Sequence, residues 1–507
     1  MSLKIKGDCV VALFLMILTL GICVLKMTES FRMVDDSAAY VSQAIALTQG
    51  TTSEFIADSV AMIGKYDLKY MTPTTYPWGF PMLLAPIYKI FGFNIVAFKS
   101  VGVICYTIFV GIFYIFCVNR LPRIYAILAV LFFALNPYMT NFAANEIFSD
   151  MPFLLFGFIT LITLAKLFGE SRSNNNGILI AIFGGIFMLF ATMIRINGFV
   201  ILCALITMHG ILILKRFAPK IFTTRILKPF SLIDSPYSWQ IHAIPYVVFI
   251  IGFALVSLTL SSGTSRHWDY LANISLQSIL CNLSLILPAW FIPLNTGIDS
   301  LLLWLCVPFI LLGIYANIRP TNANKINENI FYVIFILGFF ALLLLWVEFD
   351  IRFVFLILPF LIFWCAKGFT LIGKKLFSFS LAMLIIVILL NLAWINVRDI
   401  LFIKSNTNPD DAYSPQAREI YDYIINQTPK DSTIISFKPR VFYLNTARFG
   451  FVSNDIKSLD KADFVVWNGR YTNDLPCCTQ DISLPEFQSK TQLIFQNAEY
   501  KLFKVLK

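Results

Sequence analysis

Charged residues are scarce in this chain. They make up 13% of its 507 residues, whereas hydrophobic residues make up 58%, a balance far from that of a soluble globular protein. The apolar runs also lack the strict alternation of a membrane β-barrel, and they recur at about the twenty-residue length that a helix needs to cross a bilayer. The sequence therefore predicts an α-helical polytopic membrane protein.

Signals of processing, disulfide bonding and repetition are missing as well. No small-x-small cleavage site closes the first apolar run, Val10–Met27, so we interpret it as a membrane span and not as a signal peptide. Most of the ten cysteines lie in or beside apolar segments, without disulfide or metal spacing. The vicinal pair Cys477-Cys478 is the exception, for which a free pair and a local redox site both stay open. We find no internal repeat.

The apolar runs predict about eleven crossings. The stretch Leu276–Leu294 is not counted among them, because Asn282, Pro288 and Pro293 interrupt it and a crossing there would place later basic residues outside. We interpret it as a re-entrant or interfacial segment. The predicted spans are Val10–Met27, Ile95–Val118, Ile124–Ala134, Met151–Phe168, Gly177–Ile194, Ile196–Leu214, Ala243–Leu260, Leu301–Ile318, Phe331–Val347, Phe353–Ile372 and Leu381–Ile395.

Basic residues give these spans an orientation. The net charge of +10 lies mostly in short loops between spans, so it indicates topology and not nucleic-acid binding. Three loops are predicted to be cytoplasmic, and those carrying Asp35 and Asp36, Glu146 and Asp150, and Arg195 and Asn197 then open together on the other side. The cytoplasmic loops contain Arg120 and Arg123, Lys166 and Arg172, and Lys215, Arg216, Lys220, Arg225 and Lys228.

The composition divides the chain into two domains. Residues 1–397 form the transmembrane domain, with 27–94 as its first extracytoplasmic loop. From about Arg398 polar residues become common and apolar runs shorten, which predicts that 398–507 form a small extracytoplasmic α/β domain. Its predicted elements are a helix over Gln416–Gln427 and strands over Thr433–Phe437, Val441–Leu444 and Phe464–Trp467.

Two adjacent carboxylates stand where the first span ends, in the stretch Arg32–Gly50. Asp35 or Asp36 could cap a helix over Ala38–Leu47 that Gly50 would end, with Asp36 and Tyr40 on one face. Capping is the common use of aspartate at such a position. A catalytic base held at the membrane surface is the alternative interpretation.

Two further segments of the outer face carry candidate residues. Thr75–Gly92, which includes Tyr76, is aromatic and broken by prolines, so we expect it to lie in the interface as an anchor, as the wall of a lipid cavity, or as both. A helix through Glu146 and Asp150 would place both carboxylates on one face. The helix dipole accounts for their presence, but their repulsion also suggests a bound divalent cation, an amine, a hydroxyl-rich substrate or a shared proton.

Arginines at two outer turns suit a lipid phosphate. Arg195 lies between two spans with almost no loop, where it could snorkel to the surface or bind phosphate in a bidentate way. Arg352 lies in the segment Glu348–Phe353 and could be paired to Asp350 or free for phosphate. Arg266 and His267 are weaker candidates.

These segments together resemble the membrane-embedded C-superfamily of glycosyltransferases, which includes the protein O-mannosyltransferases and the lipid A aminoarabinose transferases. The ordered set of matches carries the resemblance, with Ser37 replacing the second acid of the family's Asp-Glu-x-x-Tyr motif. The matching segments are Asp36-Ser-Ala-Ala-Tyr40, Tyr76-Pro-Trp-Gly-Phe-Pro81, Glu146 through Asp150, Arg195-Ile-Asn-Gly198 and Arg352-Phe353.

The resemblance implies a transferase that moves a sugar from a polyprenyl-phosphate donor to a hydroxyl of a glycan, lipid or protein, with inversion, at the outer face of a bacterial inner membrane. Asp36, with Asp35 beside it, would be the base. Glu146 and Asp150 would bind substrate or a divalent cation; the other expected substrate-binding residues are Tyr40, Tyr76, Arg195, Asn197 and Arg352. The small tail argues against protein O-mannosylation. A transporter or flippase of lipid-linked glycans and a non-catalytic scaffold are the alternatives.

Overall fold

Long apolar helices dominate the computed structural model. It describes residues 2–57, 76–169, 174–218, 220, 236–260, 274–289, 299–318, 323–346, 350–371, 375–405, 411–470 and 480–507. In these residues seven helices are long and apolar enough to cross a membrane. They include α1 (Ser2–Lys26), α5 (Ile95–Val118), α9 (Asn174–Ile194), α10 (Phe199–Phe217), α11 (Trp239–Thr259), α15 (Ala323–Leu345) and α17 (Lys375–Ser405).

Other predicted spans appear as shorter or bent helices. The predicted span at Ile124–Ala134 is α6 (Arg123–Ala134), which bends by 49° into α7 (Pro137–Asn145). Three more helices coincide with predicted spans, and α13 covers the segment predicted to be re-entrant. The count of eleven crossings therefore stays a prediction. These helices are α8 (Asp150–Ala165), α14 (Asp299–Ile318), α16 (Leu358–Leu371) and α13 (Leu276–Ala289).

Aromatic side chains fill the centre of the helical bundle. Phe109 and Phe113 of α5 are fully buried and contact Phe133 of α6 and Phe158 of α8 at their ring edges. In contrast, α1, α11 and α17 expose many leucines, isoleucines and valines on the outside of the bundle. This distribution is expected where lipid, and not water, surrounds the helices.

The helix after α1 starts at the two aspartates. It is α2 (Asp35–Gln49), with Asp35 and Asp36 in its first turn, and the residue before it, Val34, makes no side-chain cap. The predicted capping role is therefore wrong, because both carboxylates lie inside the helix and bind other groups. Gly50 ends α2 in the left-handed conformation (φ 73°), as predicted. Next to α2 packs α4 (Gly79–Phe91).

A five-stranded mixed sheet forms the C-terminal domain, in the order β2-β1-β3-β5-β4. The predicted helix at 416–427 and the strands at 433 and 464 are present. The predicted strand Val441–Leu444 is wrong: it lies in α19, which starts at Pro439, and a short apolar run cannot distinguish strand from helix. The elements are α18 (Pro415–Gln427), β1 (Thr433–Ile435), α19 (Pro439–Thr446), β2 (Phe449–Phe451), β3 (Phe464–Asn468), α21 (Pro485–Lys490), β4 (Thr491–Gln496) and β5 (Tyr500–Val505).

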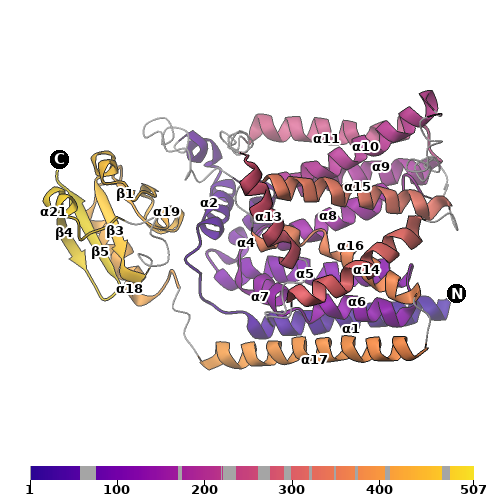
Figure 1. Ribbon diagram of the computed structural model, residues 1–507. Coiled ribbons are helices and arrows are strands. Elements are labelled where there is room, and N and C mark those ends of the chain that lie inside the picture. The colour runs from indigo at the N-terminus through magenta and orange to yellow at the C-terminus, as the bar shows by residue number, and fades with distance from the viewer. Residues whose placement is uncertain are drawn as a thin grey trace.

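Two connecting segments leave the bundle together. Lys26 at the end of α1 pairs with Asp399 of α17 at 3.1 Å, and α17 continues past the predicted boundary at 398 to Ser405. Farther along, the peptide N–H of Phe31 donates to Asp411 at 3.0 Å, and that of Ala412 donates to the Phe31 carbonyl at 2.7 Å. The C-terminal domain consequently lies at the end of the bundle that carries α2 (Figure 1).

Several residues singled out in the sequence lie outside the described residues. They are Arg172, Arg225, Lys228, Arg266, His267, Glu348, Cys477 and Cys478.

Candidate functional site

Asp36 lies where α2, the segment before α4 and the turn before α16 meet. Its Oδ2 accepts a hydrogen bond from Arg352 Nη2 at 3.1 Å, and its Oδ1 accepts one from the Tyr76 hydroxyl at 2.6 Å. Arg440 Nη1 of the C-terminal domain is 3.8 Å from Oδ1. The Asp36 side chain is 23% exposed. Hydrogen bonds therefore hold the Asp36 carboxylate in place, while its exposed part remains accessible to a reactant.

The charges around Asp36 decide its ionisation. Burial alone would raise its pKa, but Arg352, Arg440 and the Tyr76 hydroxyl outweigh burial and lower the pKa below its ordinary value. Asp36 is consequently anionic at neutral pH. Asp35 differs, because burial raises its pKa in spite of Arg440 and of the hydrogen bond that its Oδ1 accepts from the Arg440 peptide N–H at 3.1 Å.

Arg352 joins three carboxylates. It lies in the 3-10 turn Ile351–Val354, where Asp350 Oδ1 accepts a hydrogen bond from its peptide N–H at 3.1 Å and Asp350 Oδ2 forms an ion pair with its Nε at 3.0 Å. Besides Asp36, its guanidinium reaches Asp150, with Nη1 4.0 Å from Oδ2. The Phe148 ring lies against it, 4.6 Å from Cζ to the ring centre. The sequence left open whether Arg352 is paired to Asp350 or free, and it is paired.

Arg195 pairs with the other oxygen of Asp150. The turn Ile196–Gly198 between α9 and α10 places its Nη1 on Asp150 Oδ1, and its Cζ is 5.1 Å from the centre of the Phe353 ring. Asn197 lies buried in that turn. The two arginines expected to bind phosphate thus converge on Asp150. Neither guanidinium is free of a carboxylate.

Glu146 and Asp150 do not share a helix face. Glu146 is extended (φ −108°, ψ 138°) after the end of α7, and α8 begins only at Asp150. The predicted continuous helix is wrong because Pro152 has no peptide N–H to donate to residue 148 and its ring clashes with that carbonyl. Glu146 pairs with Arg32, and the carboxylates no longer need a shared cation. The described residues contain no group of three or more His, Cys, Asp or Glu that could hold a metal ion.

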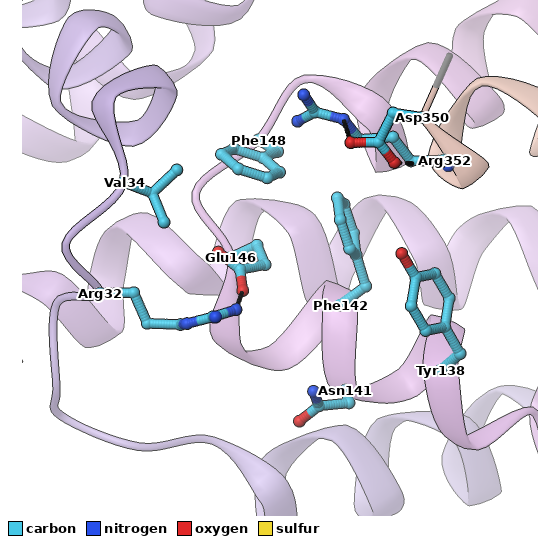
Figure 2. A pocket seen from close by; sticks show the side chains of 9 residues that line it. All are labelled: Arg32, Val34, Tyr138, Asn141, Phe142, Glu146, Phe148, Asp350 and Arg352. Atoms are coloured by element: carbon cyan, nitrogen blue, oxygen red, sulfur yellow. Dashed lines mark hydrogen bonds and ion pairs between the residues drawn. The ribbon is translucent and has the colours of Figure 1, made fainter. Parts of the chain in front are cut away.

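A cavity of about 180 Å³ lies between these pairs. Figure 2 shows Arg32 with Glu146 on one side and Asp350 with Arg352 on another, with the Phe142 ring between them. The second oxygen of Glu146, Oε2, is buried and accepts no hydrogen bond from the residues that the structure describes. Such an acceptor in a polar and aromatic cavity suits a hydroxyl-rich ligand. The residues that line the cavity are Arg32, Val34, Tyr138, Asn141, Phe142, Glu146, Phe148, Asp350 and Arg352.

Tyr40 and Tyr76, the two tyrosines predicted for the site, pack against each other beside Asp36. The Tyr40 ring centre is 4.9 Å from that of Tyr76 and also 4.9 Å from that of Phe80. The Tyr40 hydroxyl shares a 2.8 Å hydrogen bond with Ser149. Burial raises the pKa of Tyr40 to about 12, so this hydroxyl keeps its proton. Asp36 and Tyr40 of α2 therefore lie on one face of the helix, as their spacing predicts.

Sequence reasoning did not identify three residues of this site. Arg440 follows Pro439 at the start of a helix in the other domain, and nothing in its local sequence links it to Asp36. Arg32 was visible only as the first residue of the acidic stretch, and Tyr138 as an aromatic after the third predicted span. All three become site residues through contacts that are distant in the sequence.

Comparison with known proteins gives matches only to solved structures. No protein-family model and no curated protein matches this chain. The apo structure of ArnT from Cupriavidus metallidurans matches with a TM-score of 0.58 and 10% identity over 97% of each chain. Its complex with undecaprenyl phosphate gives 0.56 and 12%, over 99% of this chain and 97% of that one.

A second protein supports the same assignment. The archaeal oligosaccharyltransferase AglB from Archaeoglobus fulgidus, in complex with an inhibitory peptide and a dolichol-phosphate, has a TM-score of 0.56 and 12% identity, covering 92% of this chain and 70% of that one. At these identities the likeness establishes the fold. The chain has the helical-bundle fold of ArnT and AglB, with its small α/β domain at the end that carries Asp36.

Proposed function

We propose that this protein transfers a sugar from a polyprenyl-phosphate donor to an acceptor hydroxyl, with inversion at the anomeric carbon. The observation that carries the proposal is that the anionic, partly exposed Asp36 pairs with Arg352. Arg352 also lies near Asp150, which pairs with Arg195. The solved neighbours add support, because ArnT binds undecaprenyl phosphate and AglB a dolichol-phosphate in structures of the same fold.

The arginines are suited to the phosphate of the donor. A guanidinium can bind phosphate through two parallel hydrogen bonds, and those of Arg195 and Arg352 approach each other across Asp150. Phosphate would take over bonds that these arginines now make to carboxylates. Positive charge at this point also stabilises the leaving polyprenyl phosphate as its bond to the sugar breaks.

Asp36 would act on the acceptor. Its carboxylate accepts a hydrogen bond from the acceptor hydroxyl and aims the oxygen at the anomeric carbon, on the face opposite the phosphate. As the new glycosidic bond forms, the C–O bond to the phosphate breaks and the hydroxyl proton moves to Asp36. The lowered pKa keeps Asp36 ionised at neutral pH, so that its carboxylate can accept this hydrogen bond.

The cavity beside Arg352 would hold the polar part of a substrate. Glu146 Oε2 and the Asp350 carboxylate can accept hydrogen bonds from sugar hydroxyls, and Asn141 can both donate and accept them. Phe142 and Phe148 supply apolar ring surface. Tyr40 and Tyr76 would line the path of the acceptor, while Asn197 stabilises the Arg195 turn. In this proposal Glu146 and Asp150 bind substrate and not a divalent cation, because each is paired with an arginine.

We propose that this reaction takes place at the outer face of a bacterial inner membrane. The loops with clustered basic residues are expected on the cytoplasmic side, and α2 and the C-terminal domain would then lie on the extracytoplasmic side. The acceptor would be a hydroxyl of a glycan, a lipid or a protein.

A direct assay tests the proposal. The purified protein in lipid vesicles would be incubated with radiolabelled polyprenyl-phosphate sugars and with glycan, lipid and peptide acceptors. Release of polyprenyl phosphate together with labelled acceptor is the expected result. Movement of the intact donor across the bilayer without bond cleavage would overturn the proposal and support a flippase.

A further inference from the structure

Helix α19 brings a charged residue of the C-terminal domain into the site. It packs on α2, and the rings of its Tyr443 and of Phe55 lie 6.1 Å apart. Its second residue, Arg440, is only 6% exposed. A buried arginine needs partners for its charge, and Arg440 finds them on the transmembrane domain.

The partners of Arg440 are the candidate base and its neighbours. Its Nη1 donates to the Tyr76 hydroxyl at 2.8 Å, and its Cζ is 4.9 Å from the Tyr76 ring centre. The same Nη1 is 3.8 Å from Asp36 Oδ1. Its peptide N–H donates to Asp35 at 3.1 Å. Arg440 therefore contacts both aspartates and Tyr76.

These contacts fix the direction of one proton. A guanidinium can only donate hydrogen bonds, so the Tyr76 oxygen must accept from Arg440. The single phenolic proton is then left to point at Asp36, whose Oδ1 lies 2.6 Å away. Without Arg440 the hydroxyl could turn, and Asp36 would lose both the ordered hydrogen bond and a nearby positive charge.

We propose that Arg440 is a positioning residue of the Asp36 site, so that the site is complete only while α19 is docked on α2. Arg440 orients the Tyr76 hydroxyl and keeps Asp36 ionised. The catalytic consequence rests on the function proposed above, whereas the effect on Asp36 itself does not.

The groups that face Asp36 define what a substitution changes. They are Arg352 before α16, Arg440 of α19, Tyr76 before α4, Tyr40 of α2, and the neighbouring carboxylates Asp35 and Asp150. Arg440→Gln removes one of the two cations and leaves both carboxylates. An opposite charge at about 4–6 Å commonly shifts a carboxyl pKa by about one unit or more, so the variant should hold a proton on Asp36 about tenfold more often at a given pH.

Carbodiimide labelling reports the proton on Asp36, because the reagent reacts with protonated carboxyl groups. The full-length protein in lipid vesicles would be labelled between about pH 4 and 7, the range around ordinary carboxyl pKa values, and the Asp36 peptide quantified by mass spectrometry. We expect Arg440→Gln to label Asp36 about tenfold faster than wild type, and Arg440→Lys, which keeps the charge, to stay within about threefold of it.

Arg448 provides a matched control in the same domain. It is 4% exposed and donates only to Thr428, Ile425 and Thr446 among the described residues. Arg448→Gln should lower the melting temperature without changing Asp36 labelling. Equal labelling of Asp36 in wild type and Arg440→Gln, or an equal rise in Arg448→Gln, would overturn the proposal.

Two further measurements keep the outcomes separate. If Arg440→Gln does not fold, Tyr76→Phe replaces it: it removes the oriented hydroxyl, and unchanged Asp36 labelling there would overturn the proposal. If transfer is detected, the acidic limb of the pH profile of kcat/KM should move upward in Arg440→Gln. If wild type transfers no sugar, the proposed function fails, while labelling still decides the role of Arg440.

Discussion

The carboxylates of Asp35 and Asp36 are adjacent in the sequence but accept hydrogen bonds from different domains. Asp35 Oδ1 accepts the peptide N–H of Arg440 in the C-terminal domain, whereas Asp36 Oδ2 accepts Arg352 of the transmembrane domain. Successive residues of a helix point about 100° apart, which allows this division. One acidic motif thus both docks a domain and supplies the candidate base.

Exchanging each aspartate for asparagine should separate these roles. Asp36→Asn is expected to fold and insert normally but to lose about two to four orders of magnitude in transfer rate, the usual contribution of a proton acceptor. Asp35→Asn keeps an oxygen for the Arg440 N–H, so its loss should stay below about tenfold. Release of labelled polyprenyl phosphate measures both. Full activity of Asp36→Asn would remove Asp36 as the base.

Arg352 should control donor affinity through its shape as well as its charge. Arg352→Gln removes the cation from Asp36, Asp150 and Asp350, and we expect KM for the donor to rise about tenfold or more, since hydrogen bonds to charged groups contribute about 1.5–3 kcal/mol. Arg352→Lys keeps charge but not the planar fork, so it should be intermediate. Donor titrations of the initial rate test this order, and a lysine variant equal to wild type would contradict it.

The burial of Glu146 should make stability depend on pH, and its pairing with Arg32 should weaken that dependence. Burial raises the pKa of Glu146 although Arg32 opposes it, so the folded protein binds the proton more tightly than the unfolded chain and stability falls as pH rises through this range. Arg32→Gln raises the pKa further. Because Arg32 is 43% exposed, we expect a loss of only about 1–2 kcal/mol, largest at alkaline pH and smallest below about pH 5.

Thermal unfolding of Arg32→Gln at several pH values would show this trend. The double variant Arg32→Gln, Glu146→Gln is the control, since it has no carboxylate to titrate at this position. A deficit of Arg32→Gln that stays constant with pH would argue that the arginine acts through packing alone.

Gly79 should be needed where α4 crosses α9. A Cβ on Gly79 would lie 2.5 Å from the Met193 carbonyl carbon and 2.6 Å from the Ile194 nitrogen. Backbone atoms cannot step aside, so Gly79→Ala should push α4 from the Arg195 turn and cost about 1–3 kcal/mol. Melting temperature and transfer rate should both fall. Gly21→Ala is the control, because among the described residues no atom beyond its chain neighbours and the backbone of its own helix lies within 4 Å of the added Cβ.

Local patterns predicted the parts of this fold that depend on nearby residues. The helix Ile95–Val118, the end of α2 at Gly50 and the tight turn at Arg195 follow from the length of apolar runs and from glycine. The break between Glu146 and Asp150 was missed because Pro152, two residues farther on, outweighs a favourable helical spacing.

The charge pairs of the site could not be predicted in the same way. Arg32 with Glu146, and Arg440 with Tyr76 and Asp36, join residues far apart in the sequence. The distance in sequence between these partners follows neither the helix period nor the strand period, so no sequence pattern indicates the pairing. The pattern placed the acidic and basic residues at one end of the bundle, but only the packing decides which carboxylate binds which arginine.

The two connecting segments that leave the bundle side by side act as a tether. Because Asp411 and Ala412 hold the linker against Phe31, the C-terminal domain stays within a short reach of α2 even when α19 detaches. Redocking is then an intramolecular event at an effective concentration on the order of millimolar. Weak contacts by α19 are therefore sufficient to return Arg440 to Tyr76, whereas the same domain supplied as a separate chain would have to find its place by ordinary bimolecular binding.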